Sequence, residues 1–450
     1  MSNTASFKAA QIIKCCNSVV SCLASSIIIF MILTEPEKGL ASPYSRIIFA
    51  MSISDILFSL GMLLSPFMGP KDNPDALFAI GTTESCEAIG LIFALGLTCL
   101  VFYTVFLTYY FMRRIKYKVT PQNFAKKEEK YFHISFIVFA VAFVITSVSS
   151  GSINPQGKGN ICGIGPYPIG CDKTPDMICK RGDGKVTQFL LALSATMWIG
   201  AFVTLIVILV LFTHHVYRAE RILTIPAREI GNVHHRREPD EDVDVDQAEE
   251  IADGLEENNA DEIMASREEK NRLILTKQAL HQSMLYILAF FSSWLSPLIL
   301  VIQINFLDII EEQEWRFWLA AILTPLTGVF NILIYTRPKV FKLKEIIPDA
   351  SYIELLTVII VSGGEIPSMA DLLNETTTRR DQNGRFTQQG DIQQEGQFDD
   401  DMGDGLSEEA GSDFSSNSLV SYDLDVSNEA ALLSRKNESG QSLFSVIRQR

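Results

Sequence analysis

Apolar residues are gathered into long runs along this chain, and polar residues separate the runs. A helix needs roughly 20 predominantly apolar residues to cross a bilayer core about 30 Å thick, because backbone amides in lipid must be satisfied within the helix. Seven runs meet this requirement, approximately residues 11–33, 45–68, 87–112, 132–150, 186–212, 278–303 and 315–335. The pattern predicts an all-α fold, a seven-transmembrane helix bundle within residues 11–346.

The runs are nearly free of charge, and Asp55 is the exception at depth. An ionised carboxylate that faces hydrocarbon is costly, so we expect Asp55 to face the bundle interior, where it is a functional candidate. The alternative is a purely structural carboxylate satisfied by the neighbouring hydroxyls of Ser52, Ser54 or Ser59.

The loops between the runs differ in positive charge, which marks the cytoplasmic side of a membrane protein. One side carries Arg113, Arg114, Lys116, Lys118, Lys126, Lys127 and Lys130 in its second loop, with further cations around its third loop and after the last run. This side is predicted to be cytoplasmic. Residues 1–10 then form a short extracellular N-terminus, although Lys8 and Lys14 flank the first run on the outer side. We expect the plasma membrane as the location.

Four of the eight cysteines lie on the predicted outer side, where disulfides persist. Cys86 lies at the outer end of the third run, and Cys162, Cys171 and Cys179 lie in the loop before the fifth. Three pairings are possible. We favour Cys86 with Cys162 and Cys171 with Cys179, the second closing a short loop; free thiols are the alternative.

Two long polar segments contain most of the net charge of −15. Residues 218–277 form a long acidic cytoplasmic loop, and residues 347–450 form an acidic, Ser-rich cytoplasmic tail. Their composition predicts disorder in both. The tail is typical of a substrate for kinases and a site for an arrestin-like partner, but a merely solubilising tail has the same composition.

The residues within the runs resemble those of G-protein-coupled receptors. Ser52-Ile53-Ser54-Asp55 is similar to the small-x-x-Asp pattern of that superfamily. There the carboxylate lies in a hydrated pocket and commonly accompanies a sodium ion. The resemblance implies the same for Asp55; we expect no other metal and no cofactor.

The seventh run, from Pro325 to Tyr335, looks most like the cyclic-AMP-receptor-like and secretin-like branches of the superfamily. Pro325 and Gly328 predict a bend, because proline frees a carbonyl and glycine allows close packing. Asn331 and Tyr335 share a helix face and resemble the Asn-Pro-x-x-Tyr switch of rhodopsin-like receptors, with Ile332 in place of the proline. The resemblance implies that Asp55, Asn331 and Tyr335 form an interior polar switch.

The sixth and third runs resemble rhodopsin-like receptors only in part. Phe290 and Trp294 have the spacing of an aromatic toggle, but Pro297 is one position later than in the Trp-x-Pro pattern. A kink and a buried Trp are also ordinary features of membrane helices. At the inner end of the third run, Arg113-Arg114 lacks the acidic residue of Asp-Arg-Tyr. We expect Arg113, Arg114 and Lys116 to contact the effector.

These observations predict a receptor that senses an unknown extracellular ligand and signals to a heterotrimeric G protein by outward movement of the sixth helix. Membrane lipid is a further partner, and nucleic acid is not expected. The alternative is a seven-span transporter of a small solute. A retinal protein is excluded because the seventh run has no lysine for a Schiff base. No pattern of catalytic residues indicates an enzyme.

Overall fold

The computed structural model describes residues 3–35, 39–71, 78–156, 161–168, 171, 177–182, 184–224, 277–299 and 314–364. Most of the predicted acidic loop, and the predicted tail beyond residue 364, lie outside the described residues.

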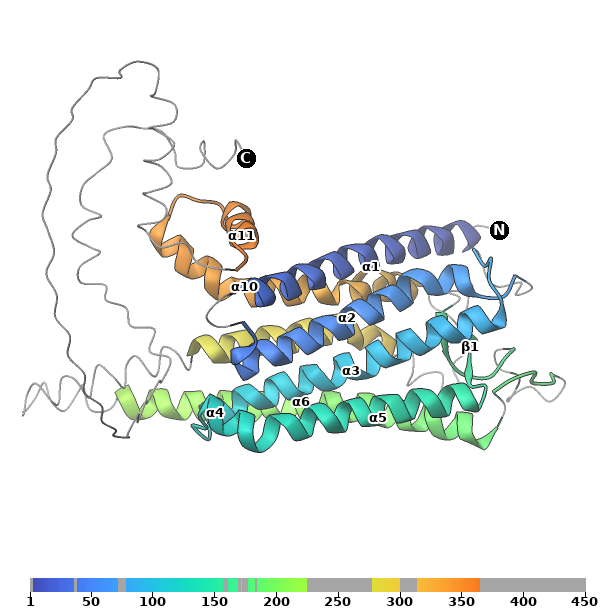
Figure 1. The fold of residues 1–450 in the computed structure, drawn as a ribbon, viewed down its shortest axis with the longest axis horizontal. Coiled ribbons are helices and arrows are strands. Elements are labelled where there is room, and N and C mark those ends of the chain that lie inside the picture. Colours follow the sequence, from blue (N-terminus) through green and yellow to red (C-terminus); the bar gives the residue numbers. More distant parts are fainter. Residues whose placement is uncertain are drawn as a thin grey trace, which may run out of the picture. The chain divides into compact units, whose positions relative to one another are not determined.

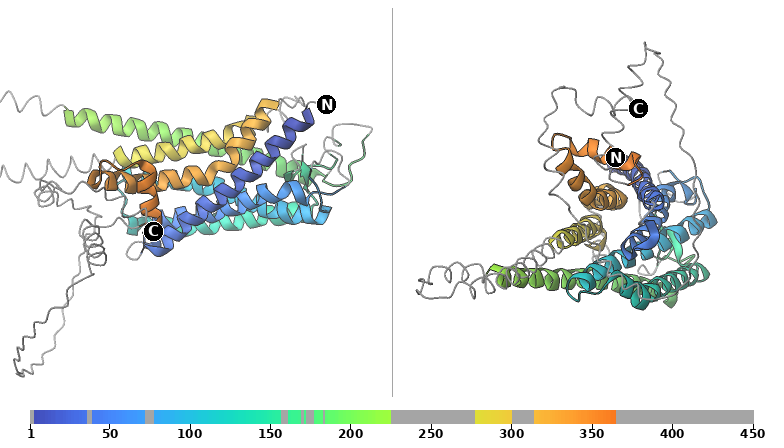
Figure 2. Two further views of the ribbon diagram at one scale, coloured as in Figure 1. Left: turned by 90° about the horizontal axis from the view of Figure 1, so that it is seen from above. Right: turned by 60° about the vertical axis from the view of Figure 1, so that its left-hand side comes forward.

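Seven helices among the described residues are long and apolar enough to cross a membrane, which confirms the predicted fold class. They are α1 (Asn3–Thr34), α2 (Pro43–Met68), α3 (Thr83–Ile115), α5 (Lys130–Ser149) with the turns before it, α6 (Lys185–Thr224), the helix Lys277–Ile299, and α9 (Glu314–Leu323) continued by α10 (Thr327–Ile346). Figures 1 and 2 show the helices running along a common direction. The chain alternates between two ends of the bundle.

The two ends of the bundle differ in chemistry. The N-terminus of α1 lies at the same end as the hairpin of β1 (Ile153–Gln156) and β2 (Ile161–Ile164) (Figure 1). Disulfides join Cys86 to Cys162 and Cys171 to Cys179 at this end, which is the favoured pairing. We call it the disulfide end. The opposite end, where α3 finishes with Arg113 and Arg114, is called the basic end.

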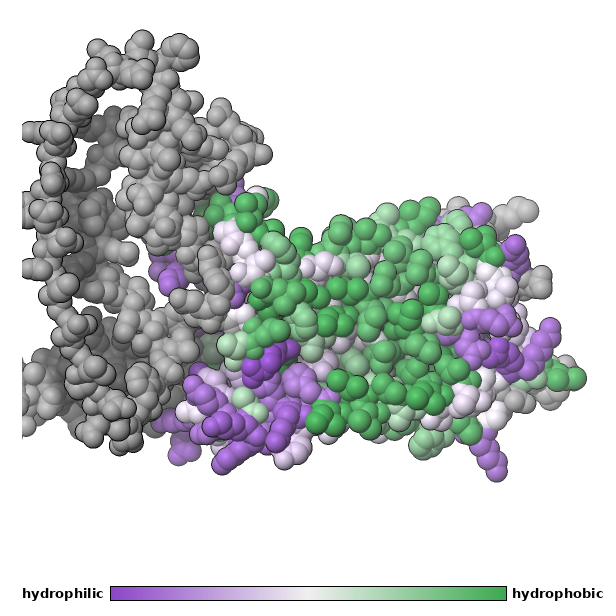
Figure 3. Space-filling model, in the orientation of Figure 1, coloured by the Kyte–Doolittle hydropathy of each residue, from purple (hydrophilic) through white to green (hydrophobic). Residues whose placement is uncertain are grey.

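A broad apolar band lies between these ends. Figure 3 shows hydrophobic residues along the middle of the bundle and polar residues gathered at its two ends. On α5 the exposed side chains include Ile134, Val138 and Ile145. Apolar side chains on the outside of a helix bundle are expected where the solvent is lipid.

The fourth span begins earlier than the predicted residue 132. The short helix α4 (Pro121–Phe124) leads through a π-helical turn, η2 (Ala125–Glu129), directly into α5. Thr120 caps this start with its side chain, and Pro121 follows at the first position, where a missing N–H costs nothing. The basic residues of η2 therefore lie on a helical element rather than in an open loop.

A short helix follows the seventh span, where the sequence predicted a disordered tail from residue 347. Helix α11 (Tyr352–Val361) starts with a capping box between Ser351 and Glu354. Its Leu355 and Ile359 are buried. The turn after it is held by Thr34, whose hydroxyl donates to the Gly363 carbonyl (2.9 Å). The prediction of disorder is therefore wrong for residues 352–361, which are apolar enough to pack against the bundle.

Candidate functional site

Asp55 lies in the middle of α2 and is fully buried. Its Oδ2 accepts hydrogen bonds from Ser25 Oγ (2.7 Å) and Ser21 Oγ (3.1 Å), both on α1. The backbone N–H of Gly328, at the start of α10, donates to the same Ser21 hydroxyl (2.8 Å). One carboxylate thus connects three helices, and we call these four residues the Asp55 cluster.

Gly328 is required by the close packing of this cluster. A Cβ at this position would lie 2.4 Å from Asp55 Oδ2 and 2.6 Å from both the Ser21 carbonyl oxygen and Ser25 Oγ. No real side chain has such contacts, so any larger residue must displace α10 or the serines. The predicted close packing at Gly328 therefore occurs against the carboxylate itself.

The hydroxyls that bind Asp55 are not those of its own helix. Ser54 donates to the Ala50 carbonyl (2.8 Å), and the hydroxyls of Ser52 and Ser59 have no hydrogen-bond partner within the described residues. The other oxygen of Asp55, Oδ1, is also without a partner there. The sequence signal that could have identified the true partners is the spacing of Ser18, Ser21 and Ser25, which share one face of α1.

The other two residues of the predicted switch are buried on α10 but differ in their surroundings. The amide nitrogen of Asn331 has no hydrogen-bond partner in the part of the chain that the structure describes. Tyr335 stacks on Tyr44 of α2, with ring centroids 6.3 Å apart. Tyr44 in turn accepts a hydrogen bond from Gln282 Nε2 (2.7 Å) on the sixth span. Tyr335 therefore belongs to a second cluster nearer the basic end.

The predicted aromatic toggle is packed inside the bundle. Trp294 contacts Trp198 of α6 (centroids 4.6 Å apart) and Phe58 of α2 (5.1 Å), while Phe290 contacts Phe202 (5.1 Å). The Trp294 Nε1–H has no acceptor among the described residues.

The two predicted bends lie close to helix ends. Pro325 lies in η3 (Thr324–Leu326), the 3₁₀ turn that separates α9 from α10. Thr324 ties this turn to the sixth span, because its hydroxyl donates to the Ser293 carbonyl (2.9 Å). Pro297 lies near the end of the described part of the sixth span, Lys277–Ile299.

At the basic end, Arg113 forms an ion pair with an acidic residue, although none of its neighbours in the sequence is acidic. Glu128 of η2 accepts hydrogen bonds from Arg113 Nε (3.1 Å) and Nη2, and from the Tyr109 hydroxyl (2.8 Å). The acid comes from the start of the fourth span rather than from the residue before the arginine. The motif position before the arginine is not acidic, and the acidic partner comes from a residue that is distant in the sequence.

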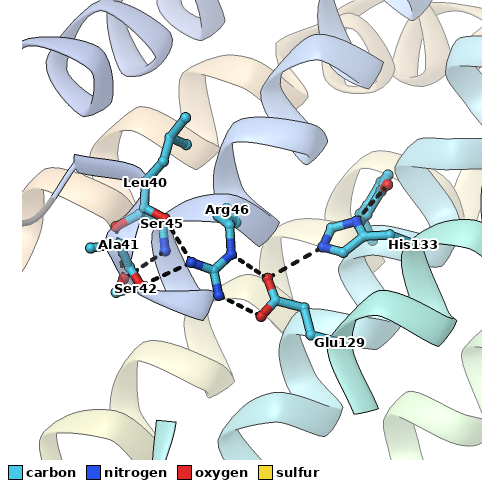
Figure 4. Close-up of polar contacts among 8 residues, drawn as sticks. Leu40, Ala41, Ser42, Ser45, Arg46, Glu129 and His133 are labelled. Atoms are coloured by element: carbon cyan, nitrogen blue, oxygen red, sulfur yellow. Dashed lines mark hydrogen bonds and ion pairs between the residues drawn. The ribbon is translucent and has the colours of Figure 1, made fainter. Parts of the chain in front are cut away.

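The next residue, Glu129, makes a second ion pair with another helix. It accepts from Arg46 Nε and Nη2 of α2, each at 2.6 Å, and its Oε1 lies 3.5 Å from His133 Nε2 (Figure 4). Nη1 of Arg46 donates to the carbonyls of Leu40 and Ala41. Adjacent residues on a helix point in different directions, so Glu128 holds α3 while Glu129 holds α2. We call these two ion pairs the double clasp.

The other predicted effector residues lie at the same end. Arg114 Nη1 donates to the Val119 carbonyl (3.4 Å), and Lys116 is the C-terminal cap of α3. Within the described residues, no three His, Cys, Asp or Glu side chains are grouped as metal ligands would be.

A second charged residue lies inside the bundle, where the sequence pattern did not predict one. Lys14 was placed at the flank of the first run, yet it lies within the first span, Ser6–Thr34, and is 2% exposed. Asp55 is therefore not the only ionisable residue at depth. The helix extends to Asn3, which moves Lys14 away from its end.

Part of the chain is similar to a known protein family. Residues 10–157 match the family model of serpentine type 7TM GPCR chemoreceptor Str. The matched model is that of a family of G-protein-coupled receptors. It describes neither the cyclic-AMP-receptor-like nor the secretin-like branch. No curated protein sequence matches the chain. A solved structure that is similar is the crystal structure of squid rhodopsin, at 15% identity and a TM-score of 0.48, over 82% of this chain and 93% of that chain.

The matched segment contains the first four spans and β1. It includes Asp55 with its serine partners and both acidic residues of the double clasp, whereas Gly328 and Tyr335 lie beyond it. The serpentine-receptor likeness therefore covers the half of the bundle that holds the double clasp.

Proposed function

We propose that this protein is a G-protein-coupled receptor that detects an extracellular chemical and activates a heterotrimeric G protein. The observation that carries the proposal is the match of residues 10–157 to a serpentine chemoreceptor family, on a chain with seven membrane-spanning helices. Under this proposal the basic end faces the cytoplasm of the plasma membrane and the disulfide end faces outward. Kinases and an arrestin-like protein act on the tail.

The double clasp suggests how an inactive state is held. Arg113 is engaged by Glu128, and Arg46 by Glu129, so α2, α3 and the fourth span are tied together at the end that meets the G protein. A ligand shifts the equilibrium only if it binds one state more tightly than the other. In the state that the ligand binds more tightly, Arg113 has left Glu128 and the sixth helix has moved outward.

The Asp55 cluster and the aromatic residues connect the ligand side to the clasp. Asp55 Oδ1, which has no partner among the described residues, is the atom that would hold a sodium ion. Ligand contact displaces Trp294, the turn at Pro325 and the sixth-span end at Pro297 act as hinges, and Tyr335 changes its contact with Tyr44. Asp55, Asn331 and Tyr335 remain the proposed polar switch.

Nucleotide exchange tests the proposal. Full-length protein is reconstituted in nanodiscs, and GTP binding by a panel of purified G proteins is followed without agonist and with a chemical library. The variant Arg113→Ala/Arg114→Ala should lose exchange, while Arg181→Ala, which breaks the ion pair with Glu87 (2.7 Å) at the disulfide end, should keep it. Absence of exchange with every G protein and every chemical would favour the transporter alternative.

A further inference from the structure

A buried polar stripe runs along α1. Its members are spaced three or four residues apart, so they share one face of the helix. All of them are at most 2% exposed: Gln11, Lys14, Ser18, Ser21 and Ser25. The stripe begins near the disulfide end and finishes at Asp55, and the residues that continue it on the same face, Ile28 and Ile32, are apolar.

The two halves of the stripe differ in how their polar atoms are satisfied. Ser21 and Ser25 bind Asp55, and Ser18 donates to the Lys14 carbonyl (2.8 Å). Gln11 is different, because neither its Oε1 nor its Nε2 has a hydrogen-bond partner within the described ranges. Buried side-chain amides in proteins are nearly always hydrogen-bonded, so Gln11 Nε2 is in place to donate to an acceptor that an occupant supplies.

Lys14 lies one helical turn from Gln11 on the same face. A lysine is almost never fully buried unless acceptors surround its ammonium group, and inside a membrane such a residue usually marks a ligand or ion site. Its three N–H donors can serve more than one acceptor at once. A cation and an amide side by side are a donor set for two oxygen atoms of one anionic group.

This part of α1 packs along α9, the first half of the seventh span. Asn17 Nδ2 donates to the Ile322 carbonyl of α9 (3.1 Å), and Trp318 Nε1 of α9 donates to Ser6 Oγ of α1 (3.0 Å). These two contacts lie on either side of Gln11 and Lys14 along α1. Gln11 and Lys14 therefore lie in the part of α1 that runs beside α9, toward the end that the proposed function places outside the cell.

We propose that Gln11 and Lys14 bind the carboxylate of a small organic acid. Lys14 Nζ and Gln11 Nε2 donate to the two carboxylate oxygens, and the apolar part of the acid lies between α1 and α9. In a low-dielectric interior this charge pairing distinguishes an acid from a neutral analogue of the same shape. The role of the acid as an agonist rests on the proposed function, whereas the binding site does not.

Thermal unfolding of the full chain in nanodiscs tests the site directly. The probes are straight-chain alkanoates from propionate to decanoate, each compared with its primary amide. At least one acid should raise the unfolding midpoint while its amide does not, since a ligand that binds only the folded state stabilises it. Acids that stabilise the protein no more than their amides would overturn the proposal.

Two variants locate the effect. Lys14→Met and Gln11→Leu should each weaken acid binding at least about tenfold, the loss expected for one charge-assisted hydrogen bond. Lys8→Met is the matched control, because Lys8 is exposed on the same helix and its substitution should leave binding unchanged. If Lys14→Met does not fold, the acid affinity of Gln11→Leu alone tests the site. Acid binding that is unchanged in the folded variants, or lost in the control, would contradict the site.

G-protein activation is measured separately on the same samples. Acid binding that requires Lys14, with no nucleotide exchange on any G protein, would contradict the proposed function and leave the site intact. Exchange driven by a neutral chemical, with no acid binding, would contradict the site and leave the receptor function intact.

Discussion

At the scale of single residues, the buried carboxylate of Asp55 joins α1 to α2. Asp55 could be identified from the sequence because a charged residue stands out within an apolar run. The spacing of Ser21 and Ser25 marks a polar face of α1, but only the fold pairs that face with Asp55 and brings Gly328 of α10 against it. The contact of Gly328 with the carboxylate makes its side-chain volume the most direct test of this geometry.

Gly328→Ala should destabilise the protein by about 1–3 kcal/mol, the usual cost of adding a methyl group where there is no room. The free energy of unfolding in nanodiscs measures the change. Gly200→Ala is the control, because a Cβ there meets nothing within 4 Å. It should not destabilise the protein and should stabilise it by up to about 1 kcal/mol, because alanine favours a helix over glycine. Equal stability of the two variants would show that α10 does not approach Asp55 this closely.

Asp55→Asn should alter basal or evoked signalling without lowering the amount of protein at the cell surface. The substitution keeps the shape of the side chain but removes its charge, so the contact with α1 changes more than the packing. Asp349→Asn, at an exposed position after α10, is the control. Unchanged signalling from a verified surface population would remove Asp55 from the mechanism.

At the scale of helices, apolar length predicted the spans well because lipid requires it. The ends were less predictable. The cap at Thr120 starts a helix in polar surroundings, where apolar periodicity carries no signal, and the cap at Ser351 starts an apolar helix that is too short to cross a membrane. The double clasp was missed for a different reason, since Glu128 is 15 residues from Arg113 along the chain. Only the three-dimensional arrangement brings them together.

Glu128→Gln should raise agonist-independent nucleotide exchange several-fold. The variant removes the charge that holds Arg113 but keeps a side chain of the same size, so α3 is released without a cavity. Glu87→Gln, in an ion pair of similar exposure at the disulfide end, should leave basal exchange unchanged. An unchanged or lower basal rate in Glu128→Gln would contradict the idea that the clasp holds the inactive state.

Ile359→Ala should loosen α11, because Ile359 is fully buried and truncation of such a side chain costs about 2–5 kcal/mol. Hydrogen exchange of the amides of residues 352–361 should become faster. Ile353→Ala is the matched control, since Ile353 is 74% exposed and contributes little packing. If both variants exchange at the rate of the unmodified protein, α11 is not held by its buried face.

At the scale of the whole molecule, the account places the disulfide end outside the cell and the basic end inside. The charge asymmetry of the loops predicts this orientation, and the two disulfides at one end agree with an oxidising compartment. A cysteine at the exposed Ile80 should react with an impermeant thiol reagent on intact cells, and one at the exposed Tyr117 should not. The reverse labelling pattern would invert the topology.

The central claim is that the basic end activates a G protein. In the inactive state, the ion pair with Glu128 keeps Arg113 from contacting that G protein. The most direct measurement compares basal nucleotide exchange for the unmodified protein, Glu128→Gln and Arg113→Ala/Arg114→Ala, reconstituted in equal amounts with the most responsive G protein. The account predicts that Glu128→Gln is fastest and the double-alanine variant falls to the rate of empty nanodiscs. Three equal rates above that background would show that the exchange does not pass through Arg113 and would contradict the account.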